Sequence, residues 1–254
     1  MNARWLMAAA ALALLASGCG LGNGKPDRSG TIECTQVEVA PQVAGRLQSL
    51  PPQEGDALKK GDLVAQIDPT DYQFRRDESA AAARAAEADL RRIQQVFERK
   101  SATQKQLDDA QAALDLARAR LALAEKAVAD CTVRAPMDGV VTVRSREEGE
   151  MVAIGAPLVT LSRLDEVWLS IYVPEDRLGR VKLGQPANVK IDGDHKMYLG
   201  KVTFVSPEAE FTPRNVQTPD ERAKLVYRVK ITLENPEGVF KPGMPADGYI
   251  ESAK

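Results

Sequence analysis

The sequence predicts a mainly β protein whose β segments are interrupted by a long antiparallel α-helical hairpin. One β motif occurs twice at a constant spacing of 94 residues, and two segments with a heptad pattern lie between the copies. After the second copy come several short strand-like segments separated by Gly, Pro and Asn residues, which is typical of a small antiparallel barrel.

The first 19 residues have the pattern of an export signal. Arg4 provides a short basic start, and the apolar run over residues 5–16 is too short for the roughly 20 residues that span a bilayer as a helix. Small residues precede Cys19 in an order that resembles a bacterial lipobox, although alanine replaces the usual leucine three places before the cysteine. We expect residues 1–19 to be a lipoprotein signal peptide with Cys19 as the acylated residue, and residues 20–30 to be a flexible tether. An ordinary cleaved signal with an incidental cysteine is the alternative.

The two β copies, at residues 40–69 and 132–162, are each too short to bury an apolar face alone. We therefore expect them to fold against each other, so that the segment between them projects outward as an arm. A strand over residues 31–39 precedes the first copy. The repeated pairs are Gly45 and Gly139, Leu47 and Val141, Glu54 and Glu148, Gly55 and Gly149, Leu58 and Val152, Gly61 and Gly155, Val64 and Leu158, and Ile67 and Leu161.

Residues 70–131 form the predicted helical hairpin. Two heptad runs, separated by a short polar break at residues 100–103, indicate antiparallel helices of about 28 residues, each roughly 40 Å long at 1.5 Å rise per residue. Alanines in the seam let the two backbones approach closely, and charged outer faces suit a solvated arm. The predicted seam consists of Tyr72, Ser79, Ala83, Ala86, Leu90, Ile93 and Phe97 in the first helix and Leu107, Ala110, Leu114, Ala117, Leu121, Ala124, Val128 and Cys131 in the second.

Residues 163–251 are expected to form the small barrel. The strand over residues 31–39 is expected to join it, which would bring both ends of the chain into one domain. Further strands are predicted at residues 167–173, 187–191, 200–205, 225–233 and 246–250.

Composition argues against several functions. A net charge of −2 and a pI near 5.7 argue against a nucleic-acid-binding protein. The chain has one histidine, His195, lacks Gly-x-Ser-x-Gly and His-Glu-x-x-His motifs, and carries six scattered methionines. We therefore assign no catalytic, cofactor-binding or metal-binding residue and expect no enzyme activity.

Two further cysteines, Cys34 and Cys131, belong to an exported chain, in which disulfides can form. Cys34 precedes the first β copy and Cys131 ends the helical arm, so their placement favours two buried thiols. The alternative is a disulfide between Cys34 and Cys131.

Seven short segments of the two copies and the barrel match a known pattern. They are Ala44–Leu47, Glu54–Asp56 and Lys60–Leu63 in the first copy, Arg134–Val141 and Glu148–Glu150 in the second, and Leu164–Trp168 and Lys241–Met244 at the two ends of the barrel. These segments resemble the periplasmic adaptor family, also called membrane fusion or HlyD-type proteins. The resemblance covers about residues 31–250. It implies a lipoyl-like barrel-sandwich hybrid built from both copies, a helical hairpin and a small antiparallel β-barrel.

The hairpin tip matches the docking motif of this family, which is Arg, a hydrophobic residue four positions on and Ser seven positions further. Arg92, Val96 and Thr103 hold these spacings. The resemblance implies that this tip meets the tip of a TolC-like outer-membrane channel, where a guanidinium and a hydroxyl can bond acceptors on an opposing coil. As the alternative, Arg92 pairs with acidic neighbours on its helix, and Thr103 caps the second helix in a capping box with Gln106. The two roles are compatible.

The resemblance implies a periplasmic adaptor that links an inner-membrane exporter to that channel. Residues 211–219 and 225–227 look most like adaptors of ABC-type exporters, and the chain stops soon after the last barrel strand, where many adaptors of resistance-nodulation-division pumps have a further domain. A proton-driven resistance-nodulation-division pump is the alternative partner. The family also implies a ring of identical subunits, with a hexamer expected, in the periplasm of a Gram-negative bacterium and anchored by the lipid, with the inner membrane favoured.

A lipoyl- or biotinyl-type carrier domain is the remote alternative from another class. Such a carrier needs a lysine on the turn between its two halves, and the hairpin occupies that junction here. The export signal also contradicts a cytosolic carrier.

Overall fold

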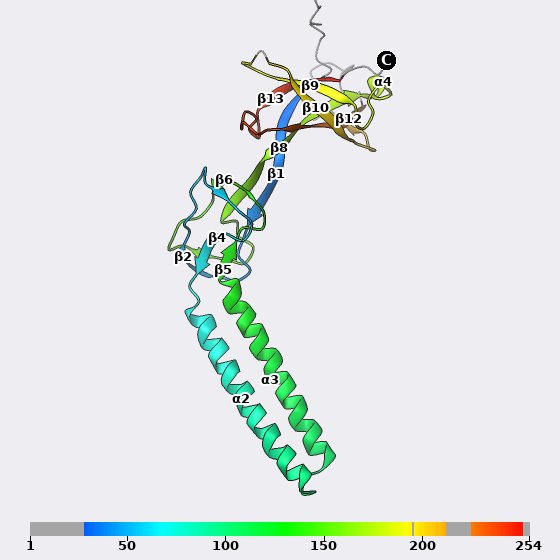
Figure 1. The fold of residues 1–254 in the computed structure, drawn as a ribbon. Helices are drawn as coiled ribbons and strands as arrows, with labels where there is room; N and C mark the ends of the chain where they lie inside the picture. Colours follow the sequence, from blue (N-terminus) through cyan, green and yellow to red (C-terminus); the bar gives the residue numbers. More distant parts are fainter. Residues whose placement is uncertain (1–27, 195, 212–224, 251–254) are drawn as a thin grey trace, which may run out of the picture. The chain divides into compact units, whose positions relative to one another are not determined.

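The computed structural model describes residues 28–194, 196–211 and 225–250. The predicted acylation site Cys19, His195 and most of the segment 211–219 therefore lie outside the described residues. The part that is described is mainly β and contains one long helical hairpin, which confirms the predicted fold class (Figure 1).

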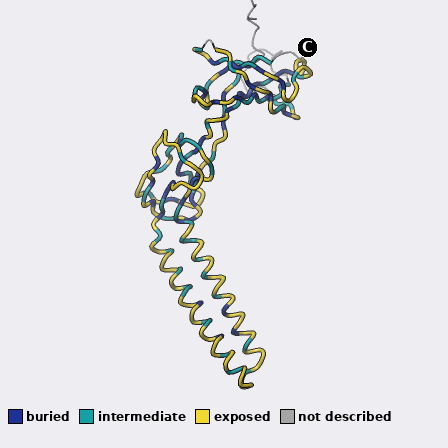
Figure 2. Tube along the Cα trace, viewed as in Figure 1, coloured by how far each residue is buried: buried dark blue, intermediate teal, exposed yellow. Residues whose placement is uncertain are grey.

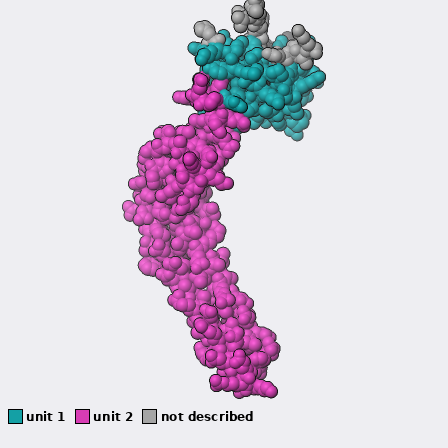
Figure 3. All heavy atoms as spheres, in the orientation of Figure 1, with its two compact units in different colours: residues 1–33, 168–234, 242–254 teal, residues 34–167, 235–241 magenta. Residues whose placement is uncertain are grey.

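The chain divides into two compact units, which Figure 3 distinguishes by colour. Unit 1 consists of Met1–Glu33, Trp168–Glu234 and Pro242–Lys254, and unit 2 consists of Cys34–Val167 and Asn235–Lys241. Unit 1 holds the barrel, and unit 2 holds both β copies and the hairpin.

The two β copies of unit 2 pair with each other. Strand β2 of the first copy pairs with β7 of the second, and β3 of the first pairs with β6 of the second, both antiparallel. Neither copy is thus a separate sheet, as expected for segments too short to bury an apolar face alone. The strands are β2 (Gly45–Ser49), β3 (Ala57–Leu58) and β4 (Leu63–Ile67) in the first copy, and β5 (Thr132–Arg134), β6 (Gly139–Arg144), β7 (Met151–Val152) and the start of β8 (Val159–Pro174) in the second.

Backbone hydrogen bonds between the copies are reciprocal. The N–H of Gly55 donates to the carbonyl of Val141 at 2.8 Å. The equivalent N–H of Gly149 donates to the carbonyl of Leu47, also at 2.8 Å. Gly55 adopts a φ of 96° and Gly149 a φ of 91°, a region that strains any residue with a Cβ. The repeated glycines therefore shape two equivalent turns that tie each copy to the other.

The repeated glutamates make a second reciprocal contact. Glu148 Oε1 accepts a hydrogen bond of 2.8 Å from the N–H of Leu50. Glu54 Oε1 accepts one of 3.0 Å from the N–H of Arg144, which occupies the equivalent position. Each carboxylate thus satisfies a backbone donor in the other copy, which explains why the repeat contains glutamate.

One hydrophobic core lies between the two copies. Repeated apolar positions of both copies supply its centre, and each of these side chains is at most 1% exposed. The shared core confirms that the copies fold against each other. Its central side chains include Leu47, Val64 and Ile67 from the first copy and Val141, Leu158 and Leu161 from the second.

The hairpin leaves the paired copies as two helices, α2 (Thr70–Glu98) and α3 (Gln104–Asp130), which lie side by side in Figure 1. Every seam position predicted from the heptads is buried or half-buried, whereas most other helical residues are exposed (Figure 2). The heptad prediction is therefore confirmed. The fully buried seam residues are Ala83, Leu90, Ala110 and Leu114.

The side-chain oxygen at the start of α2 comes from Asp68, the residue before the N-cap. Pro69 occupies the N-cap and forms no side-chain cap hydrogen bond. Asp68 instead accepts from the backbone N–H of Thr70 at 3.0 Å and from its hydroxyl at 2.7 Å. These hydrogen bonds lower the pKa of the Asp68 carboxyl, because they favour its charged form.

The barrel of unit 1 closes through six strands of the described chain. Their order is β12, β10, β9, β13, β1 and β8, and β8 pairs again with β12. The beginning of β1 pairs antiparallel with β13, so an early segment joins strands near the C-terminus. The elements are β1 (Arg28–Val39), α4 (Glu175–Leu178), β9 (Pro186–Ile191), β10 (Tyr198–Val205), β11 (Glu210–Phe211), β12 (Leu225–Glu234) and β13 (Pro245–Ile250).

The units divide the chain differently from the predicted barrel segment 163–251. Strand β8 runs without a break through residue 163, and residues 235–241 belong to unit 2. Asn235 explains the second difference, because its side-chain amide donates to the carbonyl of Leu164 at 2.7 Å and to that of Phe240 at 2.8 Å. This turn is therefore bound to residues of unit 2.

Both remaining cysteines are buried free thiols, so the predicted preference against a disulfide is confirmed. Burial raises the pKa of the Cys34 thiol, and a hydrogen bond with Ser162 offsets part of this shift. Burial also raises the pKa of the Cys131 thiol, whose Sγ donates to the carbonyl of Ala127 at 3.3 Å. A raised pKa keeps both thiols protonated and weakly nucleophilic.

Candidate functional site

At the tip of the hairpin, helix α2 ends in a hydrogen-bonded C-terminal turn. Lys100 adopts a φ of 60° and donates its N–H to the carbonyl of Phe97 at 2.8 Å. Ser101 donates its N–H to the carbonyl of Val96 at 3.0 Å. This pair of bonds is a Schellman motif, in which the left-handed residue is usually glycine. The sequence offers no signal for it, because lysine stands at that position.

Replacing Lys100 with glycine should raise the free energy of unfolding of unit 2 by about 0.5–1 kcal/mol, since glycine removes the left-handed strain. Thermal unfolding followed by circular dichroism measures this effect. Ser101→Gly is the matched control: Ser101 has no positive φ, so glycine there should stabilise nothing. Equal effects of the two substitutions would contradict the assignment of strain to Lys100.

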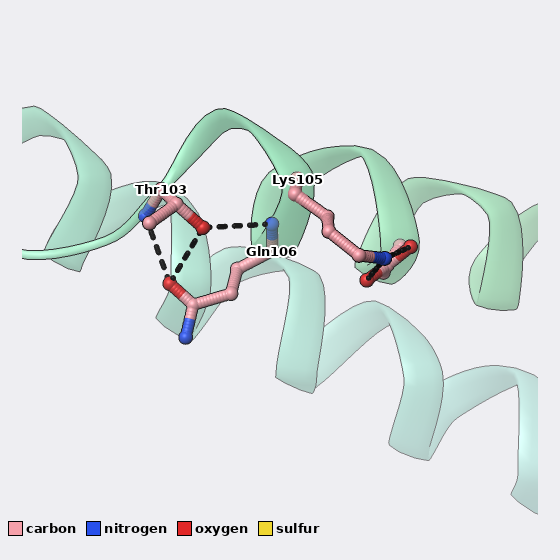
Figure 4. A network of polar contacts seen from close by, with 4 residues as sticks. Thr103, Lys105 and Gln106 are labelled. Carbon is pink, nitrogen blue, oxygen red and sulfur yellow. Dashed lines mark hydrogen bonds and ion pairs between the residues drawn. The ribbon is translucent and has the colours of Figure 1, made fainter.

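The first turn of α3 is closed by a capping box, which Figure 4 shows. Gln106 donates its backbone N–H to the Thr103 hydroxyl at 3.3 Å, and Thr103 donates its backbone N–H to Gln106 Oε1 at 2.8 Å. The hydroxyl of Thr103 also donates to Gln106 Oε1 at 3.1 Å. The capping box expected from the sequence is therefore present.

This cap limits what the Thr103 hydroxyl can offer to a partner. Its single proton already points to Gln106, and one of its two lone pairs receives the N–H of Gln106. The exposed hydroxyl can therefore accept one further hydrogen bond, but it can donate one only by giving up its bond to Gln106 Oε1, while the two backbone bonds of the cap stay in place. The sequence pattern did not indicate this restriction.

Arg92 and Val96 lie one turn apart on α2. The Arg92 side chain is 70% exposed and lies 3.4 Å from the carboxylate of Asp89, which is itself 53% exposed. An exposed pair of this kind holds the guanidinium weakly, so most of its five donors remain available. Val96 is half-buried. The tip thus combines a cation, an apolar side chain and a hydroxyl acceptor, and the pairing of Arg92 with an acidic neighbour is also present.

Comparison with known proteins identifies the family. A family model described as the barrel-sandwich hybrid domain of RND MFP proteins matches residues 35–162, about half of the chain, and a model of the CusB-like β-barrel domain matches residues 166–254. The chain belongs to the membrane fusion protein family. This confirms the resemblance to periplasmic adaptors and the lipoyl-like barrel-sandwich hybrid with a β-barrel.

Relatives and solved structures of membrane fusion proteins agree with this assignment. A UPF0194 membrane protein from the asrC 5′ region of Acidithiobacillus ferridurans is 34% identical over 87% of this chain and 85% of its own length. A MacA–MexA chimeric protein with the Pseudomonas aeruginosa MexA α-hairpin has a TM-score of 0.78 and 26% identity, over 89% of this chain and 81% of its own. MacA from Actinobacillus actinomycetemcomitans has a TM-score of 0.66 and 25% identity, over 89% and 78%.

Membrane fusion proteins are structural adaptors that bridge inner-membrane transporters and outer-membrane channels in efflux systems. This membrane fusion protein is accordingly a periplasmic adaptor. Among the helices that the structure describes, none is both long and apolar enough to cross a bilayer. Within the same described residues, no group of three or more His, Cys, Asp or Glu side chains could hold a metal ion.

Proposed function

We propose that this membrane fusion protein couples an ABC-type exporter of the inner membrane to a TolC-like channel of the outer membrane, and that its hairpin tip contacts the channel. The observation that supports the proposal is the exposed hairpin that leaves the closed pair of β copies. Its tip offers Arg92, Val96 and Thr103 at the spacing of the adaptor docking motif. The adaptor itself performs no chemistry, and its partner supplies the energy.

The chemistry of the tip fits a helical channel end. The C-terminal ends of helices present free carbonyl groups, which accept hydrogen bonds and carry partial negative charge. The Arg92 guanidinium is a fork of donors for such acceptors, and Val96 is an apolar knob. The free lone pair of Thr103 can receive a donor from the same partner.

The choice of an ABC-type exporter rests on the resemblance of residues 211–219 and 225–227 to adaptors of such exporters. A resistance-nodulation-division pump is the second candidate, because the description of the matching family model contains RND. The two transporters differ in their energy source. ABC exporters hydrolyse ATP, whereas resistance-nodulation-division pumps use the proton gradient.

The energy source distinguishes these two functions. The test strain lacks ATP synthase and ferments glucose, so a protonophore collapses its proton gradient while glycolysis maintains ATP. The probe is a toxic compound whose tolerance falls when the adaptor gene is deleted. Adaptor-dependent export that continues under the protonophore supports the ABC exporter. Export that stops at once supports the proton-driven pump instead.

We further propose that the mature chain is anchored through acylated Cys19 and works as a ring of identical subunits, with six expected. The anchor is proposed in the inner membrane, within the periplasm of a Gram-negative bacterium. The lipid would keep the protein at the inner membrane, where the transporter lies.

Replacing Cys19 with serine should release the protein from membranes into the soluble periplasmic fraction, because serine lacks the thiol that is acylated. Fractionation of cells followed by immunoblotting measures the release. Cys34→Ser is the matched control, since that thiol is buried and should not affect the anchor. Unchanged membrane association of Cys19→Ser would exclude acylation as the anchor.

A further inference from the structure

The outer face of α3 carries an apolar pattern that the seam with α2 does not use. Leu116 and Leu123 are 55% and 70% exposed and lie seven residues apart. Each stands two residues after a seam leucine, which places it about 200° around the helix from that seam. Ala112 and Ala119, also exposed, lie on the same side. We call these four residues the leucine face.

The outer face of α2 carries small residues instead. Ala81, Ala85 and Ala88 are exposed, and each stands two residues after a seam position, so they lie on the side turned away from α3. Small side chains leave holes that large side chains of an opposing helix can fill. We call these three residues the alanine face.

The two faces lie at the same height along the hairpin. Within the seam Leu90 packs with Leu114, and Arg118 lies 3.7 Å from Glu87 across the helices. The alanine face ends two residues before Leu90, and Leu116 stands two residues after Leu114. The helices are antiparallel, so moving back along α2 from Leu90 and forward along α3 from Leu114 both lead toward the base of the hairpin. The two faces therefore lie at the same distance from the tip.

Charges at the ends of the faces are complementary. Glu78 of α2 lies twelve residues toward the base from Leu90, and Lys126 of α3 lies twelve residues toward the base from Leu114. These opposite charges are therefore level. Toward the tip, Arg92 of α2 and Asp109 of α3 lie within about one turn in height.

The present partners of these charges belong to the same subunit. Arg92 pairs with Asp89, and both side chains are more than half exposed, so this pair contributes little and can rearrange when a partner arrives. Lys126 pairs with Asp130, whose side chain is only 18% exposed, and it also donates to Gln42 Oε1 at 3.3 Å. The Lys126 side chain is itself 60% exposed, so Glu78 of a second copy can reach it beside these contacts.

We propose that the leucine face of one subunit packs against the alanine face of a second copy of this chain, with both hairpins pointing the same way. Rotation about a ring axis keeps neighbouring hairpins parallel, so faces at equal height meet. A contact between two different faces also continues from subunit to subunit until the ring closes. Glu78 of one copy then faces Lys126 of the next. This inference rests on the proposed ring and assigns the surface that joins its hairpins.

A pair of cysteines tests this contact in the full-length protein. In Ala85→Cys/Leu116→Cys the new thiols lie on opposite sides of one hairpin, too far apart for an internal disulfide. Oxidation in isolated membranes should give a ladder of disulfide-linked oligomers. Arg91→Cys/Leu116→Cys is the matched control and should give no ladder, because Arg91 is exposed but lies off the alanine face. The parent protein, with its buried thiols, is oxidised in parallel.

Charge reversal provides a second test that introduces no cysteine. Glu78→Lys alone and Lys126→Glu alone should each shift the purified protein toward smaller oligomers in mass photometry. The double variant should restore the parent distribution, because the pair is only exchanged. A double variant as dissociated as either single one would contradict the contact.

The outcomes separate this inference from the proposed ring. Oligomers in mass photometry without a ladder from Ala85→Cys/Leu116→Cys would overturn the contact and leave the ring standing. Absence of oligomers as well as of the ladder would overturn both. A disulfide or cross-link from the leucine face to the outer-membrane channel, rather than to a second copy, would also overturn the inference.

Discussion

Replacing Arg92 with aspartate should abolish export through this adaptor while the protein stays folded. The native ion pair with Asp89 is exposed, so its loss costs little stability. Aspartate removes five N–H donors and places a negative charge where the channel is expected to offer acceptors. Tolerance of a compound that depends on the adaptor gene should therefore fall to that of the deletion strain.

Arg91 provides the matched control, because it is the neighbouring exposed arginine on α2. Arg91→Asp makes the same change of charge and should leave export nearly normal. Because Arg92 also lies at the end of the alanine face, the oligomeric state of Arg92→Asp is measured by mass photometry. Normal export by Arg92→Asp would remove the docking role. Loss of export together with loss of oligomers would assign Arg92 to assembly instead.

Replacing Leu47 with alanine should lower the free energy of unfolding of unit 2 by about 2–5 kcal/mol. Leu47 is fully buried in the core that both β copies share, so the substitution leaves a cavity between them. Protection from hydrogen exchange should fall equally in the two copies, because neither copy has a core of its own. Denaturant unfolding, with hydrogen exchange read separately for each copy, measures both points.

Leu63→Ala is the control for this prediction, because Leu63 lies on β4 of the same copy and is 39% exposed. Its substitution should cost clearly less than that of Leu47, since less buried surface is lost. A small effect of Leu47→Ala, or a loss of protection confined to the first copy, would show that the copies do not depend on each other.

The parts of the fold that were predictable from the sequence are those with a regular period. The constant spacing of 94 residues gives the paired copies, since equivalent apolar positions such as Ile67 and Leu161 must occupy equivalent places in one core. The heptads give the hairpin, because residues such as Leu90 and Leu114 recur on one side of each helix.

Features that depend on one unusual contact were not predictable. The left-handed Lys100 has no glycine to mark it, and the reciprocal bonds of Glu54 and Glu148 need the two copies to be paired first. The binding of the Asn235 turn to Leu164 joins segments far apart in the chain. Local pattern does not record such contacts, because they form only in the folded chain.

The candidate site was partly predictable. The spacing of Arg92, Val96 and Thr103 pointed to the tip, and the capping box of Thr103 with Gln106 was expected and is present. The commitment of the hydroxyl proton to Gln106 follows only from the geometry. A role for Thr103 as donor to the channel therefore requires that its hydroxyl give up the bond to Gln106 Oε1, whereas a role as acceptor does not.

Site-specific photo-cross-linking tests the central claim that the hairpin tip meets the outer-membrane channel. A photoreactive residue replaces Ser101 at the exposed tip or, as control, Arg84 on the exposed side of α2. We predict an adduct between the adaptor and the channel from position 101 and none from position 84. Adducts with the channel from position 84 alone, or none from position 101 in cells that export, would contradict docking through the tip.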